Sequence, residues 1–200
     1  MIKARHNPFS AQRIDALTYR FITGDWDGLF LSLKRLNYRA AIIGPYGSGK
    51  TTLLEQLGNK LRQQGHGTLS IFVNQEFPHL TFAQWMDVLK SSRKNSIILF
   101  DGADSLPFWQ CILVKLISRR AKGLVIAGHR RAGLPVLIEC QTTPAILDDL
   151  LLELAGPLNE QLKQTGDKLF RQHNGNIRDV LRALYLVCSD QDGLTYTSRV

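Results

Sequence analysis

The most constraining feature of the chain is an eight-residue segment, Gly44 to Thr51, which reads GPYGSGKT. It has the spacing G-x-x-x-x-G-K-T, in which the glycines let backbone N–H groups converge on phosphate oxygens because no Cβ blocks the approach. The apolar run Ala40 to Ile43 precedes it, and leucines at helical spacing follow from Leu53. A strand, a glycine-rich loop and a helix in that order are what a phosphate-binding loop requires, so the sequence predicts one here.

The residues of this loop have expected roles. Lys50 should reach the β- and γ-phosphates of a nucleotide, and the Thr51 hydroxyl should bind Mg²⁺. The partial positive charge of the helix N-terminus adds to the attraction for phosphate. The predicted cofactors are therefore ATP and Mg²⁺, and the predicted cofactor-binding residues are Gly44, Pro45, Tyr46, Gly47, Ser48, Gly49, Lys50, Thr51 and Thr52.

A second part of the predicted site is the apolar run Ile97 to Phe100, which ends in Asp101. An acid in that position is the usual partner of a phosphate-binding loop in holding Mg²⁺, so Asp101 is expected beside Thr51 as a metal residue. Many such ATPases have a glutamate next, as the base that polarises the attacking water, but here the next residue is Gly102. The nearest acid is Asp104, with Glu76 as the second choice of base. Asp104 is alternatively a cap for a helix beginning near Leu106.

Three further polar positions belong to the prediction. His129 follows the fourth predicted strand, where it can contact the γ-phosphate or the attacking water. Arg130 and Arg131 come next, as arginine fingers for a neighbouring molecule or as a basic surface turn. Arg178 lies in the first turn of the last helix, where the helix dipole disfavours a cation. A position above the phosphates of the nucleotide would explain it there, and plain solvent exposure is the alternative. The predicted catalytic residues are Lys50, Asp101, Asp104, His129 and Arg178.

Composition excludes several other classes of protein. The chain has 200 residues, 44% of them hydrophobic, with no apolar stretch long enough to span a membrane and no apolar signal-peptide core at its start. Its three cysteines and five histidines are widely spaced, which excludes a disulfide framework and a zinc signature. A cytoplasmic location is expected.

Positive charge is unevenly distributed along the chain. The net charge is +8, and the stretch from Ser105 to Ile138 contains six Lys and Arg residues and no acid. Such clustering predicts contact with nucleic acid or with an acidic protein through residues 115–131. Cations that merely face solvent, or that serve the nucleotide, are the alternative.

The order of predicted elements indicates an α/β fold followed by helices. An amphipathic helix is predicted over 26–36, and strands over 40–43, 68–73, 96–100, 123–127 and 135–139 alternate with helices over 51–61, 81–90 and 108–120. Three helices follow, over 143–154, 158–173 and 176–188. Alternation of this kind predicts a doubly wound parallel sheet. The expected domains are an N-terminal arm (1–24), a P-loop α/β core (25–141), a helical lid (142–190) and a tail (191–200).

These motifs together resemble the AAA+ ATPases and the related signal-transduction ATPases with numerous domains. Asp101-Gly102-Ala103-Asp104 is similar to the D-G-x-D form of the acidic motif in the signal-transduction branch, and Gly175-Asn176-Ile177-Arg178 is similar to the G-N-x-R segment of the AAA+ lid. The resemblance implies a five-stranded sheet in the order 5-1-4-3-2, a sensor-1 role for His129 and a sensor-2 role for Arg178. No glutamate follows Asp101, and the loop before the fifth strand is short for the usual helix and finger.

Three functions are consistent with these observations. The first is a Mg²⁺-dependent ATPase or ATP-driven switch that acts on a macromolecular partner, with assembly into a homo-oligomer as an option. The second is a P-loop nucleotide or small-molecule kinase, and the third is a nucleic-acid-binding module that ATP stabilises. The leucine-rich helical tail, which follows all five strands, favours the first over a kinase.

Overall fold

The computed structural model of the chain describes residues 7–93 and 96–190, so the predicted tail over 191–200 lies outside the described residues. The chain forms two compact units. The α/β unit comprises residues 23–44 and 49–140. The helical unit comprises the described residues up to Ile22, the segment Pro45–Ser48, and the chain from Gln141 onward.

A parallel five-stranded sheet forms the centre of the α/β unit, in the order β2-β3-β4-β1-β5. This is the predicted order read from the opposite edge, so the fold class is confirmed. The strands are β1 (Arg39–Ile43), β2 (Thr68–Phe72), β3 (Ile97–Asp101), β4 (Gly123–Gly128) and β5 (Val136–Glu139). Since Asp101 pairs with Ala127 and Ile43 pairs with Gly128, the carboxyl ends of β3, β4 and β1 lie at one edge of the sheet.

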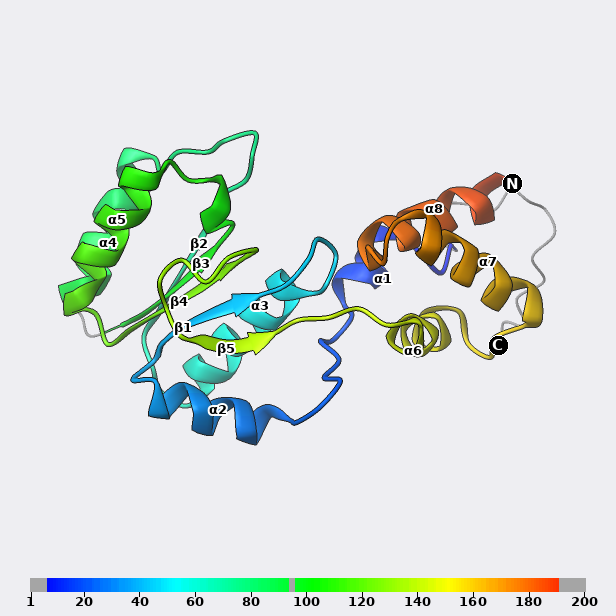
Figure 1. The fold of residues 1–200 in the computed structure, drawn as a ribbon, viewed down its shortest axis with the longest axis horizontal. Coiled ribbons are helices and arrows are strands. Elements are labelled where there is room, and N and C mark those ends of the chain that lie inside the picture. The colour runs from blue at the N-terminus through cyan, green and yellow to red at the C-terminus, as the bar shows by residue number, and fades with distance from the viewer. Residues whose placement is uncertain (1–6, 94–95, 191–200) are drawn as a thin grey trace. The chain divides into compact units, whose positions relative to one another are not determined.

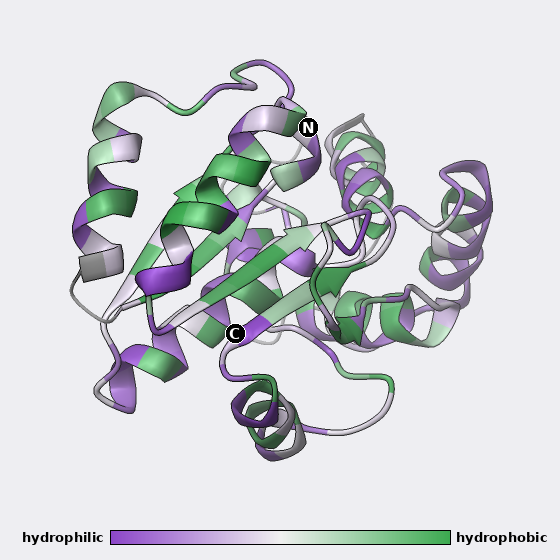
Figure 2. Cartoon of the chain, turned by 60° about the vertical axis from the view of Figure 1, so that its left-hand side comes forward, coloured by the Kyte–Doolittle hydropathy of each residue, from purple (hydrophilic) through white to green (hydrophobic). Residues whose placement is uncertain are grey.

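Apart from Arg39 at the start of β1 and Asp101 at the end of β3, the inner strands are apolar, because both faces of the sheet are covered. Ile98 and Phe100 of β3 join Leu124 and Ile126 of β4 in one buried cluster with the helices α4 (Phe82–Arg93) and α5 (Phe108–Ile117). The intervening Leu99 points to the other face and is equally buried. Continuous apolar runs of this kind are typical of buried parallel strands. Figure 2 shows the same pattern as hydrophobic colour along the strands.

Helices cover the sheet on both faces (Figure 1). The helices α4 (Phe82–Arg93) and α5 (Phe108–Ile117) lie on one face, and α3 (Lys50–Gln63) lies on the other. The helix α2 (Trp26–Arg35) lies beside α3, where Lys60 rests over the Trp26 ring. Thr81 caps α4, because its hydroxyl accepts a hydrogen bond from the Gln84 amide and the Gln84 side chain accepts one from the Thr81 amide.

The helical unit contains α6 (Pro144–Ala155), α7 (Glu160–Gln172) and α8 (Ile177–Asp190). Thr143 and Asn159 cap α6 and α7 through their side-chain oxygens. Where the sequence predicts an arm, the described residues include the short helix α1 (Ala11–Asp15) and Phe9, which is buried in the leucine core of this unit. No helix within residues 7–93 and 96–190 combines the length and apolar character that crossing a membrane requires.

Most predicted boundaries lie within three residues of the observed ones. One difference of three residues is at α5, which ends at Ile117, and Ser118–Arg120 continue as the 3₁₀ turn η3. The Ser118 hydroxyl donates to the Lys115 carbonyl and so binds a free helix-terminal oxygen there. A second 3₁₀ turn, η2 (Ala103–Ser105), follows β3 directly and carries Asp104.

Candidate functional site

The predicted phosphate loop connects β1 to α3, and its backbone has the geometry that its glycines allow. Gly47 and Gly49 have φ of +72° and +80°, in the left-handed region, and Gly49 is the N-cap of α3. The Ser48 hydroxyl donates to the Pro45 carbonyl at 2.9 Å, and Lys50 Nζ donates to the Gly44 carbonyl at 2.8 Å. The loop is thus closed by its own side chains, and the Lys50 ammonium lies at the start of the loop.

The exposure of the other loop residues differs. Pro45 and Tyr46 are exposed, and the Tyr46 side chain is 62% exposed. Thr51 and Thr52 are half-buried in the first turn of α3. No side chain caps the N-terminus of α3, whose N-cap residue is Gly49. The first backbone N–H groups of such a helix can bind an anion.

The Thr51 hydroxyl donates to Asp101 Oδ2 at 2.7 Å, so these two predicted metal residues lie side by side. The sheet register explains the contact, because β1 and β3 flank β4 and all three end at the same edge. A hydroxyl and a carboxylate oxygen are hard ligands of the type that Mg²⁺ prefers. The chemistry of this pair therefore fits a magnesium ion held beside the phosphate loop.

Gly102, which occupies the position of the usual glutamate, is required by the backbone. Its φ is +77°, and a Cβ placed on it would collide with the Val73 carbonyl oxygen. A glutamate cannot be accommodated there without moving the chain after β2. The departure from the family pattern noted in the sequence thus has a steric cause.

The carboxylate of Asp104 accepts a hydrogen bond from the backbone N–H of His129. Asp104 is exposed, and it does not cap α5, whose N-terminus at Pro107 has no side-chain cap. Gly128 makes the contact possible, since a Cβ on Gly128 would meet the Asp104 carboxylate. Asp104 therefore connects the ends of β3 and β4, and it brings two predicted catalytic residues together.

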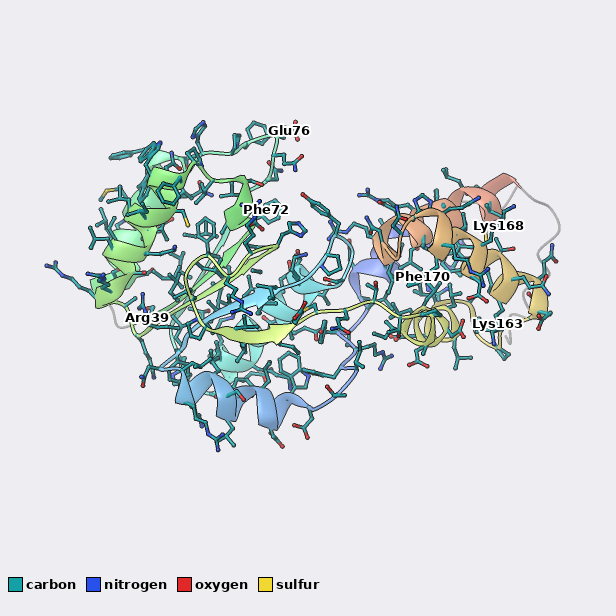
Figure 3. All side chains as sticks on the ribbon, in the orientation of Figure 1. Arg39, Phe72, Glu76, Lys163, Lys168 and Phe170 are labelled. Atoms are coloured by element: carbon teal, nitrogen blue, oxygen red, sulfur yellow. The ribbon has the colours of Figure 1, made fainter. Side chains whose placement is uncertain are left out.

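The remaining predicted residues come from three different segments of the chain. Glu76 is exposed in the loop after β2 (Figure 3). Arg130 and Arg131 are exposed in the turn after β4. Arg178 is exposed in the first turn of α8, in the helical unit, next to Asn176 and Asp179, which are hydrogen-bonded to each other.

The fold divides the basic stretch 115–131 between two ends of β4. Lys122 precedes β4 and donates to His66 Nδ1 at 2.9 Å, whereas Arg130 and Arg131 follow the other end. Burial, and then the charges of Lys122 and Lys34, lower the pKa of His66. Burial, and then Arg119, lower the pKa of Arg39, whose guanidinium donates to Ser118 at 2.9 Å. Cations therefore gather at the amino ends of β1 and β4.

Two features of the site escaped the sequence analysis. The bond from His129 to Asp104 joins residues 25 positions apart, and only the sheet order brings them together. The need for Gly128 follows from that bond, and its one sequence signal was a glycine at the end of a buried apolar run. Among the residues that the structure describes, no cluster of His, Cys, Asp and Glu could hold a metal by itself.

Comparison with known proteins supports the fold. No protein-family model matches the chain, and no curated protein sequence matches it. Among solved structures, AMPPCP-bound DnaA from Aquifex aeolicus is similar, with a TM-score of 0.56 and 16% sequence identity over 86% of this chain. The chain spans 64% of the length of that neighbour. The likeness and the strand order show a P-loop NTPase fold.

Proposed function

We propose that the protein binds ATP with Mg²⁺ and acts as an ATPase or an ATP-driven switch of AAA+-like type on a macromolecular partner. The observation that carries the proposal is the hydrogen bond between Thr51 and Asp101, beside a loop with the complete G-x-x-x-x-G-K-T spacing. DnaA, which shares the fold, was solved with AMPPCP, an analogue of a nucleoside triphosphate. The assignment to the signal-transduction branch rests on the D-G-x-D motif alone.

The chain's own residues have defined tasks in this proposal. Backbone N–H groups of residues 47–51 bind phosphate oxygens, and Lys50 moves its ammonium from the Gly44 carbonyl to the β- and γ-phosphates. Thr51 and Asp101 hold Mg²⁺, which neutralises phosphate charge when it is bound. Asp104 fixes the end of β4 through His129, and His129 orients the γ-phosphate or the attacking water.

The nucleotide proposal is tested by binding of a fluorescent ATP analogue with Mg²⁺. Lys50→Ala should weaken binding by at least about tenfold, because a charge-assisted phosphate contact is lost. Thr51→Ala should remove most of the Mg²⁺ dependence, and Asp101→Asn should abolish Mg²⁺-dependent turnover while the fold is kept. Unchanged affinity in Lys50→Ala would refute the proposal. Phosphate transfer to added nucleosides or sugars, in place of hydrolysis, would favour the kinase.

Comparing Asp104→Asn with Asp104→Ala tests whether Asp104 is the catalytic base or only positions His129. An asparagine oxygen still accepts the bond from the His129 amide but cannot take a proton, whereas alanine does neither. If Asp104 is the base, Asp104→Asn and Asp104→Ala should both lower kcat by about 10² or more. If it only positions His129, Asp104→Asn should retain most of the turnover. A loss of kcat in Glu76→Gln alone would assign the base to Glu76.

The role of Arg178 stays a proposal from the G-N-x-R resemblance. A guanidinium can bind two phosphate oxygens at once. If Arg178 contacts the γ-phosphate, Arg178→Ala should lower the affinity for ATP more than the affinity for ADP. Faster amide exchange over residues 158–188 with ATP bound would accompany that loss. Equal ATP and ADP affinities in the variant would instead make Arg178 an ordinary solvated residue.

A further inference from the structure

Helix α5 presents a large apolar surface to solvent. Only Gln110 and Val114 of this helix are buried. The side chains of Phe108, Trp109, Ile112, Leu113 and Leu116, which we call the α5 face, are 37–81% exposed. The last four follow the spacing i, i+3, i+4, i+7 and so form one stripe. In Figure 2 this helix is mostly in hydrophobic colour. Soluble proteins seldom leave such a stripe uncovered unless it binds a partner.

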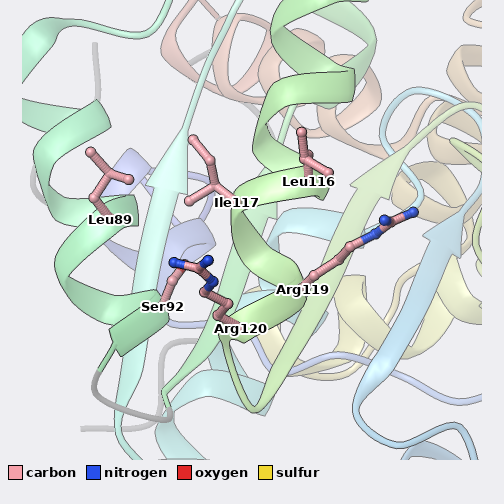
Figure 4. A pocket seen from close by; sticks show the side chains of 6 residues that line it. All are labelled: Leu89, Ser92, Leu116, Ile117, Arg119 and Arg120. Atoms are coloured by element: carbon pink, nitrogen blue, oxygen red, sulfur yellow. The ribbon is translucent and has the colours of Figure 1, made fainter.

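A groove of about 360 Å³ lies beside the α5 face, between α4 and the end of α5. Its lining is apolar on the α4 side at Leu89 and on the α5 side at Leu116 and Ile117 (Figure 4). Ser92 of α4 also lines it, is 3% exposed, and has a hydroxyl without a hydrogen-bond partner among the described residues. A buried polar group without a partner is costly, so this hydroxyl favours an occupant that brings one.

The groove ends in two arginines. Arg119 and Arg120 line it from the 3₁₀ turn η3, and both are exposed. Within the described part of the chain, neither forms an ion pair with a carboxylate. The nearest acid on the flanking helix α4 is Asp87, one turn from Lys90 on the same helix. The groove therefore combines apolar walls with cations at one end.

We propose that the α4–α5 groove and the α5 face bind an acidic amphipathic helix of a partner protein. The partner's apolar side chains would cover Leu116 and its neighbours, and its carboxylates would meet Arg119 and Arg120. A helix suits the site because the groove runs between two helices and offers no free strand edge for an extended peptide. The proposal does not depend on nucleotide binding.

The charge and the chemistry of the surface argue against two other occupants. Nucleic acid is bound by cations spread along its path, but here the two arginines lie at one end of the groove and apolar side chains form the rest of the surface. A second copy of the chain carries a net charge of +8, which opposes association of two copies. On α6, the acidic helix of this chain, Leu152 is the large apolar side chain that stands exposed beside Asp149 and Glu153. One exposed apolar side chain on α6 is too few to cover the several exposed apolar side chains of the α5 face.

The test uses the full chain and a displayed library of random peptides of about four helical turns. Selected peptides should be enriched in large apolar residues on one helical face and in Asp and Glu beside it. The affinity of a selected peptide, measured by fluorescence anisotropy, should fall at least tenfold with Leu116→Ser and with Arg119→Glu/Arg120→Glu. Amide exchange should slow over α4 and α5 when the peptide binds.

Matched controls lie in the helical unit. Leu186→Ser changes a leucine that is 61% exposed on α8, and Lys163→Glu/Lys168→Glu makes the same change in charge on α7 (Figure 3). Both should leave the peptide affinity within about twofold. Peptides without acidic enrichment, or an affinity that Leu116→Ser leaves unchanged, would overturn the proposal. Tighter binding of single-stranded DNA that only the arginine variant abolishes would overturn it in favour of nucleic acid. Dimers in sedimentation that Leu116→Ser disrupts, without peptide binding, would overturn it in favour of a second copy.

Discussion

At the scale of single residues, Gly102 shows how backbone geometry limits the chemistry of the site. Gly102 and Gly65 have nearly the same positive φ, of +77° and +80°, but only Gly102 has a backbone carbonyl in the space of a Cβ. Gly65→Ala should therefore lower the free energy of unfolding by about 1–2 kcal/mol, the cost of a left-handed alanine. Gly102→Ala should cost more than about 3 kcal/mol, because the chain at Val73 must also move.

Urea unfolding of these two variants measures the difference directly. Equal losses of stability in Gly102→Ala and Gly65→Ala would contradict the steric account. A Gly102→Glu variant with higher kcat than the parent would contradict it too, because it would show that a glutamate fits after Asp101.

His66 should make the stability of the protein depend on pH. Burial and the charges of Lys122 and Lys34 lower its pKa in the folded state. The hydrogen bond agrees, since the Lys122 ammonium can only donate, and His66 Nδ1 must accept as part of a neutral ring. The unfolded chain then binds more protons than the folded one below about pH 6.5, so stability falls as pH drops through that value.

The expected result is that the free energy of unfolding rises from about pH 5 to about pH 7, and that His66→Gln removes part of this rise. Lys122→Gln should also flatten the slope, because one cause of the lowered pKa is gone. Urea melts at several pH values provide the measurement. A slope that is identical in the parent and in His66→Gln would show that other groups cause it.

At the scale of elements, side-chain caps fix where helices begin. Asn159 Oδ1 accepts a hydrogen bond from the Leu162 amide at 2.7 Å at the start of α7. Asn159→Ala should lower the free energy of unfolding by about 1 kcal/mol, and Asn159→Asp should retain most of it, because a carboxylate accepts the same bond. Chemical denaturation of both variants tests this, and similar losses in the two would mean that the cap contributes little.

The sequence predicts that α5 is a helix, but it does not predict which face of the helix is exposed to solvent. Its pattern Phe108-Trp109-Gln110-Cys111-Ile112-Leu113 is apolar on nearly every side, so periodicity gives no polar face to assign to solvent. Only the packing reveals that the polar Gln110 is buried. Its side chain accepts a bond from the Leu80 amide at 3.0 Å, while Trp109 is 59% exposed.

At the scale of the whole molecule, binding of Mg²⁺–ATP should raise the free energy of unfolding. Mg²⁺–ATP at about 100 times its dissociation constant should add about 2.7 kcal/mol, which corresponds to a rise in Tm of about 5–10 °C for a chain of this size. Leu116→Ser should show the same rise, since the α5 face is not in the phosphate site. Thermal melts with and without Mg²⁺–ATP make the comparison, and a full rise in Lys50→Ala would contradict the proposed site.

The sequence by itself determined the fold class, the strand order through its family resemblance, and the glycine-rich loop between β1 and α3. These follow from local rules: glycine spacing, apolar runs bounded by turns, and helical periodicity all act within a few residues. It also placed Asp101 beside Thr51, because an acid after a buried strand lies at the same sheet edge as the loop.

Only the tertiary structure decided what depends on contacts between distant segments. The sequence ranked Asp104 ahead of Glu76 as the base only because Asp104 is nearer to Asp101, whereas the structure shows that the Asp104 carboxylate accepts a hydrogen bond from the His129 amide. The need for glycine at position 102 comes from the Val73 carbonyl oxygen, which occupies the space of a Cβ. The apolar side chains of α5 are exposed because no other segment that the structure describes packs over them. Such contacts depend on the order of the strands in the sheet, in which neighbours are not consecutive along the chain. A local sequence pattern therefore cannot predict which side chains a neighbouring strand places beside a given residue.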